Sequence, residues 1–216
     1  RMIGVAATAV DIAGQNSEIA RRGFKALGVE AAYMPRSAPG CVGCGTCQTG
    51  CPSGGKASAD LTWLPRYLRA GGEVLADTRV EEILLDGSGR AVGVRGVTRH
   101  QEAGERSGEG VAEFRVEAER VILAAGAVNT PLLLLRQGLA NSSGELGQNL
   151  RAHPSVWCLA KFDEDVRVWW GATQGYYAHH PEDAEILLET FSVSPDLAVS
   201  QAGGVGEDAM SFLRDF

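Results

Sequence analysis

Four of the five cysteines lie between positions 41 and 51, and thiolates this close together can hold a metal centre. Their spacing is Cys41-x2-Cys44-x2-Cys47-x3-Cys51, followed by Pro52. Intervals of two residues let successive thiolates point inward from a tight coil, which Gly43, Gly45 and Gly50 would allow to tighten. Dispersed pairs would indicate disulfides, whereas this clustering indicates a metal or cluster loop.

The spacing alone leaves several interpretations open. It is the spacing of a bacterial ferredoxin cluster loop, so Cys41, Cys44, Cys47 and Cys51 are candidate iron–sulfur ligands. No second cysteine set accompanies the run, and Cys158 is a distant additional ligand candidate. Alternatively, the cysteines are structural thiols or disulfides that line a cofactor loop. Iron–sulfur and no metal stay equally open, with zinc behind both, because the run is crowded for paired zinc knuckles.

The elements around this loop predict an α/β fold. Helical patterns lie on both sides of it, at residues 16–27 and 61–70, each ended by glycine. Strand patterns then follow at residues 73–76, 79–85, 91–97, 114–118 and 120–125. A polar loop at 100–110 lies between the third and the fourth of these strands. The sequence Asn129-Thr130-Pro131 predicts the start of a further helix, because proline is favoured early in helices. Aromatic and β-branched residues after Pro154 indicate a β-rich segment, with a change of domain near residues 147–154.

Composition excludes several classes of protein. The 216 residues are 44% hydrophobic and 22% charged, so a sizeable core can form and disorder is disfavoured. The net charge of −7, with no basic cluster, argues against nucleic acid or an anionic membrane as a partner. No apolar run is long enough to span a bilayer. No targeting segment is visible, which leaves cytoplasm and periplasm both open.

Residues 47–58 read Cys-Gln-Thr-Gly-Cys-Pro-Ser-Gly-Gly-Lys-Ala-Ser, which resembles a loop of the glucose–methanol–choline (GMC) oxidoreductases. The branch concerned contains long-chain alcohol oxidases and sugar dehydrogenases, some with an iron–sulfur cluster in this loop. Residues 77–83 are similar to the family strand whose valine, here Val80, contacts the flavin adenine through its backbone. Residues 120–131 resemble the second family signature, a buried parallel strand, a turn at Gly126 and a helix start facing the cofactor. Residues 145–154 resemble the segment that leads into the family's substrate domain.

The resemblance implies a fold and a chemistry. Residues 1–150 would form part of an FAD-binding Rossmann-like domain with a β-meander and a Cys-rich loop at 41–58. Residues 151–216 would begin an α+β substrate-binding domain. The activity would be oxidation of a CH–OH group in an alcohol, sugar or sterol, with hydride transfer to FAD. The resemblance assigns cofactor contacts to Val80, Ala125, Gly126, Ala127, Asn129, Thr130 and Pro131.

Two family features are not found in the sequence. The glycine-rich GxGxxG loop that binds the pyrophosphate is missing, and the family's catalytic histidine is expected in a later segment. We therefore assign no catalytic residue, give His153 a structural role, and expect an internal fragment that is inactive alone. A cluster, if held, would pass electrons from the flavin to an external acceptor protein. Two alternatives are a ferredoxin-like iron–sulfur electron-transfer module and a non-catalytic binding remnant.

Overall fold

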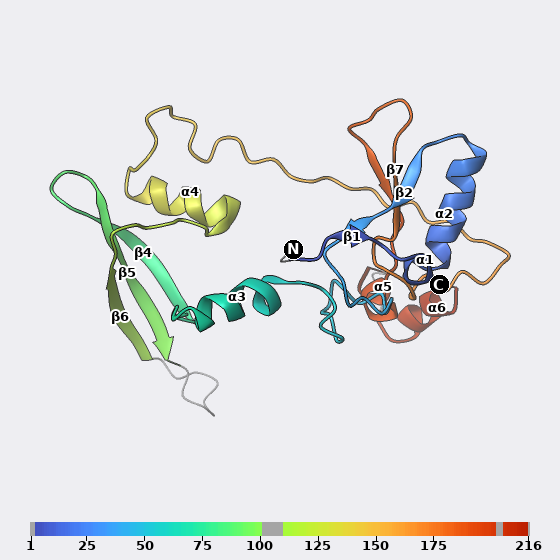
Figure 1. The fold of residues 1–216 in the computed structure, drawn as a ribbon, viewed down its shortest axis with the longest axis horizontal. Coiled ribbons are helices and arrows are strands. Elements are labelled where there is room, and N and C mark those ends of the chain that lie inside the picture. The colour runs from blue at the N-terminus through green and yellow to red at the C-terminus, as the bar shows by residue number, and fades with distance from the viewer. Residues whose placement is uncertain (1–2, 101–109, 202–204, 216) are drawn as a thin grey trace. The chain divides into compact units, whose positions relative to one another are not determined.

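The computed structural model describes residues 3–100, 110–201 and 205–215, and the chain divides into two compact units (Figure 1). The cysteine-loop unit combines Arg1–Gly72 with Leu159–Phe216. The meander unit is Glu73–Cys158. The predicted change of domain near residues 147–154 lies close to the end of the meander unit. The assignment of residues 1–150 to the cofactor and 151–216 to the substrate stays a prediction.

The cysteine-loop unit is built from short strands and helices contributed by both ends of the chain. Antiparallel pairing joins β1 to β3 and forms a second sheet in the order β2-β7-β8. The strands are β1 (Ala6–Ala7), β2 (Ala31–Tyr33), β3 (Pro35–Arg36), β7 (Tyr176–His179) and β8 (Leu187–Glu189). The helices are α1 (Val10–Ala13), α2 (Gln15–Ala26), α3 (Ala59–Arg69), α5 (Pro195–Gln201) and α6 (Glu207–Asp215).

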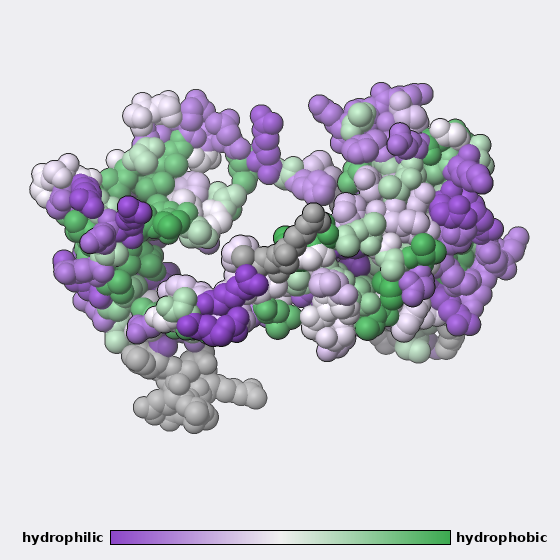
Figure 2. Space-filling view, viewed as in Figure 1, coloured by the Kyte–Doolittle hydropathy of each residue, from purple (hydrophilic) through white to green (hydrophobic). Residues whose placement is uncertain are grey.

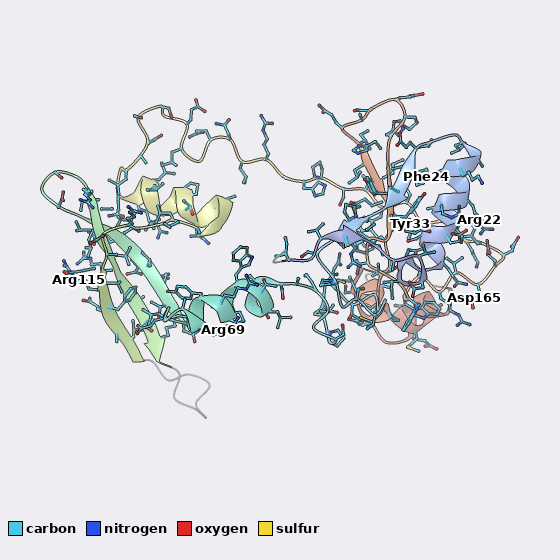
Figure 3. The ribbon with its side chains drawn as sticks, in the orientation of Figure 1. Arg22, Phe24, Tyr33, Arg69, Arg115 and Asp165 are labelled. Atoms are coloured by element: carbon cyan, nitrogen blue, oxygen red, sulfur yellow. The ribbon has the colours of Figure 1, made fainter. Side chains whose placement is uncertain are left out.

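Small and hydroxyl-bearing residues fill much of the core of this unit. Tyr176 is the largest buried side chain among the described residues of this unit, and its ring centroid lies 5.0 Å from that of Tyr33 and 6.3 Å from that of Phe24. Figure 3 labels Tyr33 and Phe24. Ser17 on α2 is 1% exposed, and its hydroxyl lies 2.9 Å from that of Thr190. Buried hydroxyls need hydrogen-bond partners, so these bonds join α2 to the chain after β8.

The meander unit is a three-stranded antiparallel sheet, β4 (Thr78–Leu85), β5 (Ala91–His100) and β6 (Gly110–Glu117), followed by helix α4 (Gly126–Arg136). The strand order is β4-β5-β6, so each strand pairs with its neighbour in the chain. The turn between β4 and β5 is closed by Asp86, whose carboxylate accepts from the backbone N–H groups of Ser88 and Arg90. Figure 2 shows hydrophobic residues gathered over these strands and α4.

The structure mixes helices and strands as predicted, but its sheets are antiparallel, so the α/β class is confirmed only at this coarser level. The helices α2 and α3 and the three strands of the meander are confirmed. Helix α4 is also confirmed, although it begins at Gly126, three positions before Asn129. The predicted strand at 73–76 is wrong, since those residues form no strand. The loop predicted at 100–110 falls largely on residues 101–109, outside the described residues. After Pro154 the described chain holds β7, β8, α5 and α6, so strands and helices share that segment.

The predicted buried parallel strand at 120–125 is wrong. These residues belong to no strand, and Ile122 is 89% exposed. A parallel strand needs neighbouring strands to complete its ladder. The paired strands among the described residues are all antiparallel. The Rossmann-like character of the fold stays a prediction. No helix in the described part of the chain is long and apolar enough to cross a membrane.

Candidate functional site

Val80, the predicted adenine contact, lies on the edge strand of the meander. It pairs with Gly96 of β5, and the register shifts between Val80 and Glu82, which makes Glu81 the extra residue of a β-bulge. A bulge locally increases twist and reorients the neighbouring residues. The Val80 side chain is 37% exposed. Because β4 is an edge strand, part of its main-chain hydrogen-bonding capacity faces away from β5.

The other predicted cofactor residues form the first turns of α4. Gly126 has φ +86°, which a side chain rarely permits, and an added Cβ would meet no atom within 4 Å. The glycine is therefore required by backbone conformation and not by space. No side chain caps the helix start at Ala125. The N–H groups of a helix's first turn lack intrahelical partners, so this exposed end can receive an acceptor or an anion.

Thr130 and Pro131 shape this helix start from its second turn. The Thr130 hydroxyl oxygen accepts from the backbone N–H of Ala125 at 3.0 Å, which fixes the turn at Gly126. Pro131 has no N–H, so the i→i−4 hydrogen bond to the Ala127 carbonyl is missing. The exposed start of α4 therefore offers backbone N–H groups as donors and the Ala127 carbonyl as an acceptor.

Gln137 was not predicted as a site residue, and it joins the two predicted cofactor segments, β4 and α4. Its amide oxygen accepts from the Ile83 backbone N–H at 2.9 Å, and its amide nitrogen donates to the Ile83 carbonyl at 3.0 Å. The side chain thus pairs with β4 as a strand residue would and fixes the end of α4 against the strand of Val80. A glutamine after an apolar helix gives no sequence signal for such a contact.

The four clustered cysteines lie around one small cavity in the cysteine-loop unit. This cysteine cavity measures about 10 Å³ and is also lined by Arg36 and Lys56. The Arg36 guanidinium lies 3.2 Å from the Cys47 sulfur and 3.6 Å from the Cys41 sulfur. The Cys44 sulfur lies 3.1 Å from the Thr46 hydroxyl. The sequence therefore predicted correctly that these cysteines gather, and it missed the arginine from β3 that enters their cavity.

The loop that carries the cysteines is anchored by its glycines. Cys44 forms an isolated parallel bridge with Gly171, whose N–H donates to the Gly43 carbonyl at 2.7 Å. Gly43 and Gly45 have φ of +72° and +69°. A Cβ on Gly45 would lie 2.6 Å from the Trp169 carbonyl oxygen, so only glycine fits there.

Cys51 has the most extensive set of hydrogen-bond donors of the four cysteines. The backbone N–H of Lys56 donates to its sulfur at 3.3 Å, and the Ser53 hydroxyl lies 3.6 Å away. These donors, the Lys56 N–H first and the Ser53 hydroxyl second, hold the pKa of the Cys51 thiol below its ordinary value. Hydrogen bonds to the charged form favour ionisation, so these donors favour the Cys51 thiolate.

The cysteines share a cavity, but they are not arranged as metal ligands. Among the described residues, no three His, Cys, Asp or Glu side chains are grouped so that they could hold a metal ion. Residues that line one cavity need not have the geometry that a metal ion requires of its ligands. The Arg36 guanidinium, moreover, contacts two of the sulfurs. The interpretation of Cys41, Cys44, Cys47 and Cys51 as iron–sulfur ligands is therefore not supported, and neither is the ferredoxin-like alternative.

Three histidines have described side chains, His153, His179 and His180, and none of the contacts found for these three indicates acid–base catalysis. His179 Nδ1 lies 2.9 Å from the Ala184 carbonyl oxygen, and His180 Nδ1 accepts from the Glu182 backbone N–H at 3.3 Å. His153 is exposed. We assign no catalytic role to any of them.

Comparisons with known proteins agree with the family resemblance of these segments. The sequence model of the GMC oxidoreductase family matches residues 1–155. The uncharacterized GMC-type oxidoreductase Rv0492c of Mycobacterium tuberculosis is 37% identical over 210 residues, covering 97% of this chain and 32% of the relative. The uncharacterized GMC-type oxidoreductase y4nJ of Sinorhizobium fredii is 40% identical over 153 residues, covering 71% of this chain and 28% of the relative.

A third relative carries a more specific name. The long-chain-alcohol oxidase FAO1 of Arabidopsis thaliana is 30% identical over 200 residues, covering 84% of this chain and 25% of the relative. The chain thus spans a third or less of the length of each of these relatives. On the family match and these identities, the chain belongs to the GMC oxidoreductase family.

Proposed function

We propose that the chain forms the flavin-facing part of an FAD-dependent oxidoreductase that oxidises a CH–OH group in an alcohol, sugar or sterol. The observation that carries this proposal is the pairing of Gln137 with Ile83, which fixes α4 against β4 within one unit. The strand of Val80 and the uncapped start of α4 are thereby held on one framework. Family membership supports an oxidoreductase, and the alcohol oxidase among the relatives supports a hydroxyl-bearing substrate.

The residues present suit FAD. The bulged edge of β4 at Val80 offers main-chain donors and acceptors, which can read a purine edge while the valine packs on the ring. The first turn of α4, including Ala127 and Asn129, offers N–H groups toward a negatively charged or acceptor-rich portion of the cofactor. Gly126 lets a ligand approach the backbone closely because no side chain intervenes.

The chemistry divides between cofactor and protein. When bound, FAD supplies the site that accepts the hydride from the CH–OH carbon. The chain's own part is to bind and orient the cofactor through β4 and α4. The base that takes the hydroxyl proton is not assigned to any residue of this chain. An electron acceptor protein stays a prediction.

Nuclear magnetic resonance of the ¹⁵N-labelled chain during titration with FAD tests this proposal, because the method detects weak as well as tight binding. We expect amide shifts to concentrate in residues 125–130 and around Val80. Gly126→Ala should weaken FAD binding by about tenfold, because the positive φ at the helix start is disfavoured for alanine.

Gly138→Ala is the matched control. Gly138 also has a positive φ and open space around its Cβ position, but it lies beyond the opposite end of α4. Equal loss of FAD binding in both variants, or amide shifts confined to the cysteine-loop unit, would contradict the assignment of the site.

A further inference from the structure

The cysteine cavity has a chemistry that the proposed flavin site does not use. Four cysteines line a space of about 10 Å³, which is roughly the room needed for a single water molecule. The described residues form no metal-ligand group there. A cavity of this size admits only very small reactants, and its reactive atoms are sulfurs.

Cys47 lies in a hydrogen-bonded turn at residues 46–50, and Cys51 follows that turn directly. The Thr46 carbonyl accepts from the backbone N–H of Thr49 at 3.1 Å and from that of Gly50 at 3.0 Å. Both Cys47 and Cys51 line the cysteine cavity. An added Cβ on Gly50 would meet nothing within 4 Å, so the turn has open space in which to tighten. Disulfide formation needs this freedom, since the two Cβ atoms must come within about 4 Å.

The sulfurs of Cys47 and Cys51 both have hydrogen-bond donors beside them. Cys51 accepts from the Lys56 N–H at 3.3 Å, and the Ser53 hydroxyl lies 3.6 Å away. Cys47 accepts from the Arg36 guanidinium at 3.2 Å. The donors at Cys51 favour its thiolate, which is the nucleophile in thiol chemistry.

The remaining two cysteines are less suited to move. Cys44 is fixed through its backbone bridge to Gly171. The Cys41 backbone N–H donates to the Ala38 carbonyl at 3.1 Å, and its sulfur is 3.6 Å from Arg36, farther than that of Cys47.

We propose that Cys51 and Cys47 form an oxidisable dithiol that reacts with hydrogen peroxide, with Cys51 as the attacking thiol and Cys47 as the resolving one. The Cys51 thiolate attacks one peroxide oxygen, the O–O bond breaks, hydroxide leaves, and a sulfenic acid forms. The Cys47 thiol then attacks the Cys51 sulfur, the S–O bond breaks, and the sulfenic oxygen leaves as hydroxide, which takes the Cys47 proton to form water. The dithiol loses two electrons and the peroxide gains them.

Peptide mass spectrometry of the whole reduced chain after treatment with hydrogen peroxide tests this proposal. Trypsin cleaves after Arg36 and Lys56, so one peptide carries all four clustered cysteines. We expect that peptide to lose the mass of two hydrogens. We also expect Cys51 to be oxidised about tenfold faster than Cys158, an exposed cysteine of the meander unit that serves as the internal control.

Two serine variants identify the roles. Cys51→Ser should abolish the mass loss. Cys47→Ser should leave a sulfenic acid at Cys51, which dimedone traps in greater amount than in the parent chain. Cys158→Ser should behave like the parent chain. Circular dichroism of each variant confirms that the fold is kept.

Three results would overturn the proposal. The first is a disulfide that persists in Cys51→Ser. The second is oxidation of Cys51 at the rate of Cys158. The third is a chain purified without oxygen that contains iron and inorganic sulfide and whose clustered cysteines resist peroxide, which would make the loop a cluster site. Because none of these readouts involves flavin, the proposal stands or fails independently of the proposed oxidoreductase function.

Discussion

In the meander unit each strand pairs with the next one in the chain, whereas the cysteine-loop unit joins the chain's two ends. There, β2 pairs with β7, so Ala31 lies opposite Ala178. The meander is held by the ladder between β4 and β5 and the ladder between β5 and β6. The cysteine-loop unit depends instead on close backbone approaches and buried hydroxyls. Pairing between neighbouring strands closes a short loop, whereas pairing between distant segments must offset the larger entropy cost of closing a long one.

Glycines show this difference most directly. A Cβ on Gly171 would lie 2.8 Å from the Gly14 Cα and 2.9 Å from the Ala13 carbonyl oxygen. All three residues belong to the cysteine-loop unit, and the contact joins its two chain segments. In the meander, Gly89 has a positive φ for its turn, but a Cβ there would meet nothing within 4 Å. A side chain at Gly171 would meet both a steric collision and a disfavoured φ, whereas one at Gly89 would meet only the disfavoured φ.

The largest expected effect is that of Gly171→Ala. Both the disfavoured φ of +130° and the backbone collision oppose the added methyl group, so we expect a loss of about 3 kcal/mol in the free energy of unfolding. Gly89→Ala, which meets only the conformational cost, should lose about 1 kcal/mol. Urea denaturation measures both losses.

Hydrogen exchange followed by mass spectrometry locates the change. Gly171→Ala should raise exchange in α2, β2 and β7 and leave the meander strands protected. Equal losses in the two glycine variants would remove the proposed contrast between the units.

A middle-sized effect is expected for Gln137→Ala. The variant leaves the Ile83 N–H and carbonyl without their amide partners, which should lower stability by about 1–2 kcal/mol. Gln137→Glu keeps the acceptor and removes the donor, so an intermediate loss is expected. Thermal denaturation measures the order of the three proteins. A Gln137→Ala protein as stable as the parent would show that the strand ladders alone hold the meander unit.

The smallest effect is a pH dependence at the β4–β5 turn. The Ser88 hydroxyl, followed by the backbone N–H groups of Arg90 and Ser88, lowers the pKa of Asp86. A carboxyl whose folded pKa is depressed contributes stability above its unfolded pKa and loses it as the pH falls through the folded value. The meander should therefore weaken slightly below about pH 4.

Asp86→Asn is the matched variant for this turn. Asparagine keeps an oxygen acceptor without a titrating charge, so its stability should show a shallower decline with acid than that of the parent. The difference between the two pH profiles of thermal stability measures the contribution of Asp86. Superimposable profiles would mean that the turn charge plays no part.

Local patterns predicted the local part of the fold. The residues of α2, α3 and the meander strands carry their own periodicity and turn residues, so each element can be read from its own segment. The strand at 120–125 was predicted wrongly because a run of apolar residues describes a strand's composition and not its partners. The pairing of β2 with β7 likewise depends on residues that no local pattern connects.

The same limit applies to the candidate site. Gly126 and Thr130 were predicted as cofactor contacts from a family pattern, and that role stays a prediction. The structure adds the hydrogen bond between Thr130 and Ala125. The clustering of the cysteines follows from their spacing. Arg36 and Gln137 could not be found, because each acts across the fold through a side chain whose residue type is common on protein surfaces.

The side chain of Gln137 also bears on how copies of this protein avoid one another. The outer edge of β4 offers main-chain donors and acceptors to which a second chain's strand could pair. By pairing with the Ile83 N–H and carbonyl, Gln137 occupies that edge at its centre. An intruding strand would have to displace it before extending the sheet. We therefore expect this one glutamine to limit edge-to-edge pairing between chains.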